Sequence, residues 1–136
     1  MNKFVWVLIP ALTITFAITK ASHAAVVDEL LSQYQAEGAG KADAAHGKQQ
    51  WTQIYSNNKE GESRSCVSCH TKDLHVKGKH ANTGKPIDPL APSVNPERLT
   101  DIAKVEKWFK RNCKWTMDRE CTVQEKSDFL SFIRQE

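Results

Sequence analysis

Apolar residues recur along much of the chain at intervals of three and four positions, which is the spacing of helices that bury one face. The first such stretch starts at Val26, and its helix is predicted to end at Gly38 and Gly40. The apolar stripe of this helix consists of Val26, Leu30, Leu31 and Tyr34.

A second helix is predicted over residues 42–54, with Trp51 and Ile54 as its apolar anchors. Glycine inside a helix costs about 1 kcal/mol relative to alanine. We therefore interpret Gly47 as a point where another helix crosses closely. His46 lies on the same segment and is predicted to be a surface histidine rather than a ligand.

Two further helices are predicted in the C-terminal third of the chain. Thr100 or Asp101 is expected to cap the first of them, and Thr122 with Glu125 forms a capping box at the second. Their apolar stripes are Ile102, Val105, Trp108 and Phe109, and Val123, Phe129, Leu130 and Ile133. No stretch alternates convincingly as a strand does. The predicted fold is therefore all-α, with helices near both chain ends that cross one another.

The segments between these helices are polar or rich in proline. Residues 56–65 are predicted to form a loop. Residues 71–80 carry a cluster of lysines and histidines, which is either a docking face for an acidic partner or a solvated loop. Prolines in residues 81–95 exclude a helix or a central strand, yet the apolar residues of this segment need burial.

The first 24 residues have the pattern of a cleaved signal peptide. Lys3 precedes an apolar run over residues 4–18, and small residues follow it. A bilayer span needs about 20 residues, and the apolar run over residues 4–18 is shorter than that. An uncleaved membrane anchor is therefore the less favoured alternative. Cleavage is predicted after Ala24, with Ala25 as the alternative. It leaves one domain over residues 25–136, exported to the periplasm and without stable membrane insertion.

The charge balance excludes one class of function. The full chain carries 19 Lys and Arg residues against 16 Asp and Glu residues. Lys3 and Lys20 leave with the signal peptide, so the mature chain is nearly neutral. Binding of nucleic acid is therefore not expected.

The chemistry of the chain centres on the run Cys66-Val67-Ser68-Cys69-His70. This is the attachment signature of a c-type haem, in which two thiols form thioethers with the porphyrin and the imidazole binds the iron. A zinc site would need a second close Cys/His pair, and a thioredoxin-like dithiol would need a βαβ pattern. Neither is present. The motif predicts one covalent haem c, with residues 81–95 packed against its edge.

The other two cysteines are Cys113 and Cys121. Because they are close in sequence and belong to an exported chain, they are predicted to form a disulfide. Closing such a loop contributes on the order of 2–3 kcal/mol. Two free thiols are the alternative.

Function then depends on the sixth ligand of the iron. Met117, the only methionine left after processing, would give a closed electron shuttle. His75 or His80 would give a bis-histidine carrier, although both lie close to His70 in sequence. Without a strong ligand, the iron would be open to a small molecule. The residues by themselves leave these alternatives open.

A set of residues in the C-terminal half matches a known family. It consists of Thr83-Gly84-Lys85, Ile87, Pro89-Leu90-Ala91-Pro92-Ser93, Val105-Glu106-Lys107-Trp108, Arg111-Asn112-Cys113, Arg119 and Cys121. Together with the haem motif and the leading helices, these residues resemble the sphaeroides haem protein (SHP) family, a variant of class I cytochrome c. An Arg-Asn-Cys run followed by a second cysteine is not a general feature of cytochromes c.

The resemblance implies a small class I cytochrome c-like fold of about four or five helices around one haem. It makes His70 the proximal iron ligand, Asn112 the distal one, and Cys113–Cys121 a disulfide directly after that ligand. In the family, the asparagine binds ferric iron and leaves on reduction, which opens the iron to oxygen or nitric oxide. A dihaem cytochrome c is the associated electron donor.

A neutral amide oxygen is a hard, weak donor that suits ferric better than ferrous iron. We therefore expect an electron-transfer protein that also binds diatomic ligands, with a shuttle ligated by Met117 as the alternative. Without the resemblance, Asn112 would be read as a helix terminator. No general acid or base is placed over the iron, so catalysis is not predicted. The lysines expected to surround the haem edge are Lys72, Lys77, Lys79, Lys107 and Lys110.

Overall fold

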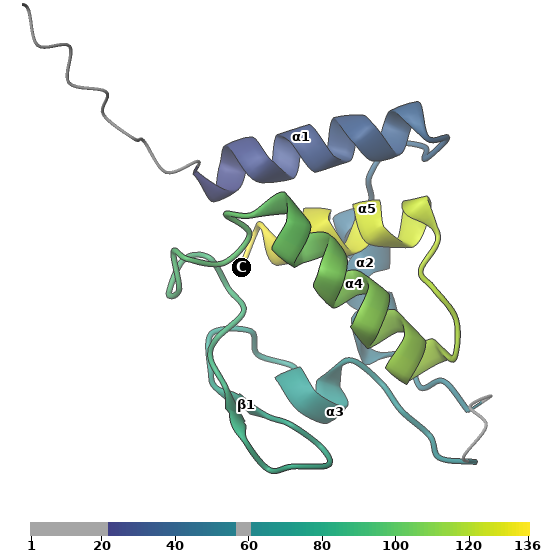
Figure 1. Ribbon diagram of the computed structural model, residues 1–136, viewed down its shortest axis with the longest axis vertical. Coiled ribbons are helices and arrows are strands. Elements are labelled where there is room, and N and C mark those ends of the chain that lie inside the picture. The colour runs from purple at the N-terminus through teal and green to yellow at the C-terminus, as the bar shows by residue number, and fades with distance from the viewer. Residues whose placement is uncertain (1–21, 57–60) are drawn as a thin grey trace, which may run out of the picture.

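The computed structural model describes residues 22–56 and 61–136 (Figure 1). Within these ranges, the helices are α1 (His23–Ala36), α2 (Ala44–Thr52), α3 (Val67–His70), α4 (Ile102–Met117) and α5 (Val123–Ile133). A short antiparallel ladder pairs β1 (Gly78–Lys79) with β2 (Pro86–Ile87). The predicted all-α fold is confirmed.

The helices near the two ends of the chain pack over one another, as the sequence predicts. Helix α5 contacts both α1 and α2, and α1 lies across the top of the molecule in Figure 1. Helix α2 crosses α5 at Gly47, where a Cβ atom would clash with the carbonyl oxygen of Asp128. The interpretation of Gly47 as a close crossing is confirmed.

Two groups of buried side chains form the core, and α5 contributes to both. The first joins α1 to α4 and α5 through Val26, Val27, Leu30, Tyr34, Val105 and Leu130. The Tyr34 hydroxyl donates to the carboxylate of Glu106 on α4, and burial raises the pKa of Tyr34 above its usual range. The second group includes Trp51, Leu74, Ala91, Met117, Phe129 and Phe132. This second group lies behind α3 and therefore supports the segment that carries the haem motif.

Both C-terminal helices begin at capping residues that the sequence indicates. The Asp101 side chain accepts a hydrogen bond from the backbone N–H of Lys104 at 2.9 Å. At α5, Thr122 and Glu125 form the reciprocal capping box. Glu125 also accepts two hydrogen bonds from the Arg119 guanidinium, at 2.6 and 2.7 Å, and these bonds lower the pKa of its carboxyl group.

Two details of the predicted secondary structure are wrong. Helix α2 ends at Thr52, and Ile54 is 67% exposed instead of anchoring it. The chain turns extended at Gln53, and Tyr55 then pairs with Arg64 in a β-bridge. The β1–β2 ladder is absent from the prediction because two residues per strand are too few to produce a readable alternation.

The predicted signal peptide lies outside the described residues, except for its last three positions. The Ser22 side chain caps α1 by accepting from the backbone N–H of Ala25, and the helix begins at His23. Cleavage after Ala24 stays a prediction. In the part of the chain that the structure describes, no helix is long and apolar enough to cross a membrane. Four positions of the predicted 56–65 loop, residues 57–60, also lie outside the described ranges.

The Gly47 crossing gives a stability prediction. In Gly47→Ala, the new methyl group overlaps the backbone of α5, so the two helices must separate. Overpacking of this kind costs about 1–3 kcal/mol. Alanine gains about 1 kcal/mol over glycine in helix propensity, so the overpacking cost is expected to be the larger of the two. We expect a lower free energy of unfolding in urea. In the control Gly40→Ala, the new methyl meets only the flexible end of Gln124, at 3.3 Å, and the change should be small. Equal stability of the two variants would contradict the crossing.

Candidate functional site

The Cys66-to-His70 motif folds as a single helical turn. Cys66 is the residue before α3, and Val67–His70 form the helix itself. The Ser65 backbone N–H donates to the Ser68 hydroxyl at 3.1 Å, which fixes the entry into the turn. Strand β1 packs directly against this turn, since a Cβ on Gly78 would clash with the carbonyl oxygen of Cys69. The turn therefore brings both thiols and the imidazole to one short segment with a supported backbone.

Trp51 supports the end of this segment from behind. Its indole N–H donates to the carbonyl oxygen of Thr71 at 3.0 Å, and its ring centroid lies 5.5 Å from that of His70. Burial, and secondarily the positive charge of Arg98, lowers the pKa of His70 to about 4. The imidazole is therefore neutral at neutral pH, which is the form that binds a metal.

The thiols of the motif have the wrong electrostatics for a redox dithiol. Burial raises the pKa of Cys66 to about 12, whereas a catalytic dithiol lowers the pKa of its attacking cysteine. Cys66 and Cys69 are both partly buried, and neither takes part in the disulfide. Their position suits structural attachment rather than thiol exchange.

A cavity of about 440 Å³ opens between α3 and α4. Its size lies within the usual range of sites for small molecules and cofactors. Cys66, Cys69 and His70 line it on the α3 side. The proline-rich segment contributes Ile87 and Leu90, in agreement with its predicted packing. The other apolar lining residues include Trp51, Leu99, Val105, Trp108, Phe109 and Phe129.

Helix α4 forms the opposite side of the cavity and carries Asn112. The Asn112 side chain is exposed and lines the cavity that His70 also lines. Asn112 is followed by Cys113, which forms a disulfide with Cys121 in the segment before α5. Because Asn112 lies inside α4 rather than at its end, the helix-terminator reading is wrong. The terminating residue is Asp118, in the left-handed conformation.

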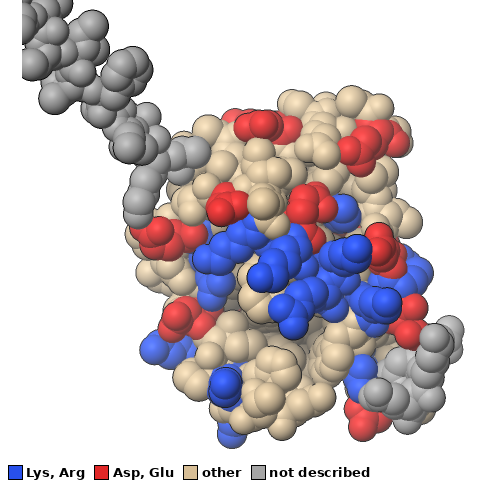
Figure 2. Space-filling model, in the orientation of Figure 1, with Lys and Arg blue, Asp and Glu red and all other residues tan. Residues whose placement is uncertain are grey.

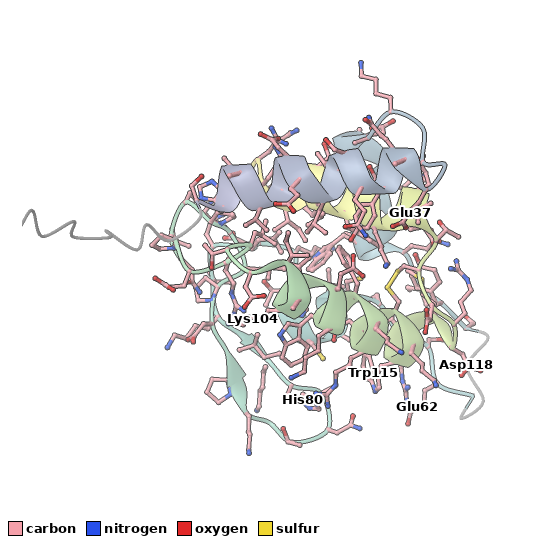
Figure 3. All side chains as sticks on the ribbon, turned by 45° about the horizontal axis from the view of Figure 1, so that its top comes forward. Glu37, Glu62, His80, Lys104, Trp115 and Asp118 are labelled. Carbon is pink, nitrogen blue, oxygen red and sulfur yellow. A yellow bond between two sulfur atoms is a disulfide. The ribbon has the colours of Figure 1, made fainter. Side chains whose placement is uncertain are left out.

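The other candidate ligands are held differently. Met117 also lines the cavity, but it belongs to the buried core, and its sulfur lies 3.9 Å from the Cys121 sulfur. His75 is exposed, pairs with Asp73 at 3.0 Å and does not line the cavity. His80 does line it (Figure 3). Its Nδ1 accepts from the backbone N–H groups of Asn82 and Thr83, each at 3.3 Å. In that tautomer, the other ring nitrogen bears the proton and has no lone pair for iron.

The residues present fit a c-type haem. Two cysteines and a neutral histidine come from one turn, and they face an apolar cavity whose far side presents an oxygen donor. A planar, largely apolar macrocycle with one edge fixed by thioethers matches this donor set and lining.

Comparison with known proteins places the chain in a family. A family model described as "Domain of unknown function (DUF1924)" matches residues 37–133. The chain is 40% identical over 105 residues to the cytochrome c-type protein SHP of Cereibacter sphaeroides, a match covering 77% of this chain and 80% of that protein. The chain belongs to the SHP family of c-type cytochromes. It therefore binds haem c covalently and is a monohaem cytochrome of electron transport.

Solved structures of similar cytochromes agree with this assignment. Oxidised SHP, described as an oxygen-binding cytochrome c, superposes with a TM-score of 0.75 at 37% identity, over 87% of this chain and all of that one. Oxidised cytochrome c'' from Methylophilus methylotrophus gives a TM-score of 0.70 at 31% identity, over 82% of this chain and 94% of that one. A solution structure of the same cytochrome c'', described in terms of haem-ligand detachment, also gives a TM-score of 0.70.

Sequence reasoning misses two contacts, of which one lies beside the haem motif. His46 is a half-exposed surface histidine, as predicted, but its Nδ1 lies 2.8 Å from the buried carboxylate of Asp128. The Arg64 side chain is buried, and it donates from just before the haem motif to the carbonyl oxygen of Trp115 on α4. No pattern in the sequence signals either contact, because both partners are distant in sequence and neither pair belongs to a periodic stripe.

Proposed function

We propose that this chain is an exported, periplasmic cytochrome whose ferric iron is bound by His70 on one face and Asn112 on the other. Asn112 leaves when the iron is reduced, and the vacated position accepts oxygen or nitric oxide. Haem c supplies the one-electron couple and the iron. The observation that carries the proposal is the exposed Asn112 amide on the α4 side of the cavity that His70 lines from α3.

The chemistry of the amide supports release on reduction. A neutral oxygen donor interacts well with the harder ferric ion and poorly with the ferrous ion. Asn112 needs only a side-chain rotation to leave, because its backbone lies within α4 and is followed by the Cys113–Cys121 disulfide. The backbone at Asn112 can therefore stay in place when the side-chain amide leaves the iron.

The descriptions of two relatives support the proposal of a weak distal ligand. SHP is described as an oxygen-binding cytochrome c, and cytochrome c'' is described in terms of haem-ligand detachment. Both descriptions fit a weak distal ligand. The alternative is a conventional shuttle with Met117 on the iron, and it is favoured only by the position of Met117 in the cavity lining.

The partner in this proposal is an acidic redox protein, such as a dihaem cytochrome c, that docks on the basic face of α4. This face is defined by Lys104, Lys107, Lys110, Arg111 and Lys114, all of them exposed. Figure 2 shows the positive side chains gathered in one band over the middle of the molecule, where α4 lies. Lys104 and Arg111 also line the cavity, so the basic face borders the haem.

The expected lysines divide between this face and a separate segment. Lys107 and Lys110 belong to the basic face of α4. Lys72, Lys77 and Lys79 lie on the segment after α3, and Lys77 pairs with Asp88 at 3.5 Å. Lys110 likewise lies 3.9 Å from Glu120. Because α4 carries five exposed basic side chains and that segment carries three lysines, the helix still has the denser positive charge.

Substitution of the distal ligand tests the central part of the proposal. In Asn112→Ala, ferric iron should become high-spin and should bind external anions more readily, because no internal ligand competes. The ferrous spectrum should change little, because there the asparagine is already released. The reduction potential should rise, by about 59 mV for each tenfold preference of the amide for ferric iron. Optical and EPR spectra with redox titration measure these changes.

Met117→Leu is the matched control. Under the proposal, it leaves the ferric spectrum unchanged. A weak near-infrared charge-transfer band in the parent protein, lost in Met117→Leu, would indicate sulfur ligation. That result, together with a low-spin and unreactive ferric form of Asn112→Ala, would reject the asparagine ligand.

Charge reversal tests the docking face. Lys107→Glu combined with Lys114→Glu leaves the cavity lining intact and should slow reduction by a dihaem cytochrome c at low salt by about tenfold or more. Added salt should slow the parent protein far more than the variant. Lys41→Glu, in the connection between α1 and α2, is the control. Reduction that is insensitive to ionic strength in the parent would remove the electrostatic part of the proposal.

A further inference from the structure

Arg64 is a buried arginine next to the haem motif. It precedes Cys66 by two residues and is 8% exposed, although arginine is seldom buried without a specific partner. Its backbone is fixed by the bridge to Tyr55. The N–H of Tyr55 donates to the Arg64 carbonyl at 2.8 Å, and the N–H of Arg64 donates back at 3.0 Å. The side chain thus starts from a constrained position beside α3.

The guanidinium of Arg64 binds the last turn of α4. Its Nη1 donates to the carbonyl oxygen of Trp115 at 3.0 Å, and its Cζ lies 4.4 Å from the centroid of the Trp115 ring. Carbonyl groups in the last turn of a helix lack intrahelical donors and carry the negative end of the helix dipole. Arg64 therefore supplies both a hydrogen bond and a positive charge at this end of α4.

Glu62 holds the guanidinium in this orientation. Its carboxylate accepts from Nη2 of Arg64 at 3.1 Å. Figure 3 shows Glu62 and Trp115 on the lower side of α4, toward its C-terminal end. A planar group that is bound on two edges and stacked on a ring has little freedom to shift.

This contact connects the two sides of the cavity near the proposed ligand. Trp115 follows Asn112 by three residues, so the two side chains lie on the same side of α4, and both line the cavity. The Cys113–Cys121 disulfide joins α4 to the segment before α5. Arg64 instead joins α4 to the segment that enters the haem motif, and its contact therefore restrains the distance between α4 and α3.

We infer that Arg64 is a positioning residue that holds α4 at the separation from α3 at which Asn112 reaches ferric iron. The inference rests on the ligand role proposed for Asn112. Without the Arg64 contact, the last turn of α4 moves away from the haem motif more easily, and the ferric bond of Asn112 weakens. The ferrous state is unaffected, because Asn112 is already released there.

Imidazole binding to the ferric holoprotein is the test. The titration is carried out above about pH 8, where free imidazole is mostly neutral, so removal of the Arg64 charge does not by itself alter its attraction to the site. Losing a hydrogen bond from a charged donor commonly weakens an interaction by about tenfold or more. In Arg64→Ala, the apparent affinity for imidazole should rise about tenfold, with a larger high-spin fraction before addition. The affinity of the ferrous protein for carbon monoxide should stay the same.

The double variant Arg64→Ala/Asn112→Ala separates positioning from general loosening. If Arg64 acts through Asn112, its removal should change imidazole affinity by less than about twofold once the asparagine is absent. Arg64→Lys, which keeps the charge but cannot bind on two edges, should fall between the parent and Arg64→Ala. It replaces Arg64→Ala if the latter does not retain haem. Arg134→Ala is the control, since it breaks the ion pair with Asp28 at 2.9 Å and does not touch the cavity.

The outcomes distinguish the ligand role proposed for Asn112 from the positioning role inferred for Arg64. Unchanged imidazole affinity in Asn112→Ala would reject the proposed ligand. Increased affinity in Asn112→Ala with parent-like affinity in both Arg64 variants would reject only the role of Arg64. An Arg64 effect that persists in the Asn112→Ala background, or that Arg134→Ala reproduces, would show a general loss of structure and would also reject the positioning role.

Discussion

The separation of α3 from α4 is the constraint on which the rest of the structure depends. Helix α3 is one turn long, and together with Cys66 directly before it the helix carries the groups that attach the haem. Such a short segment cannot follow a distal side that changes its position. Helix α4 is fixed by the Tyr34–Glu106 contact with α1 and by the Cys113–Cys121 disulfide. These contacts fix the α4 side of the cavity that the Cys66-to-His70 segment lines from the other side.

A weak distal ligand requires such a fixed distal side. A methionine or histidine ligand binds iron strongly enough to draw its own segment into place, whereas a neutral amide supplies little binding energy for that purpose. The proposed asparagine would therefore bind only if α4 already lies at the right distance. Release on reduction would then need a side-chain rotation alone. A fixed position of α4 thus allows Asn112 to bind ferric iron through a weak bond that breaks on reduction.

Local chemistry made much of this fold predictable from sequence. The haem motif, the capping residues Asp101 and Thr122 and the crossing at Gly47 are read from short patterns with direct physical causes. Ile54 was misread because an apolar residue at helical spacing can still lie beyond the helix end. The contact of Arg64 with Trp115 and that of His46 with Asp128 were missed. Each joins residues more than 50 positions apart, so neither leaves a periodic signal. The ligand role proposed for Asn112 rests on the family resemblance, because its position in the sequence alone favours a helix terminator.

Structures of the holoprotein in both oxidation states test the central claim most directly. The account predicts that the Asn112 amide oxygen lies within bonding distance of ferric iron, opposite His70, and that it is rotated away from ferrous iron while α4 stays in place. Met117 sulfur on the iron in both states would contradict the account. So would an Asn112 amide that remains bound after reduction.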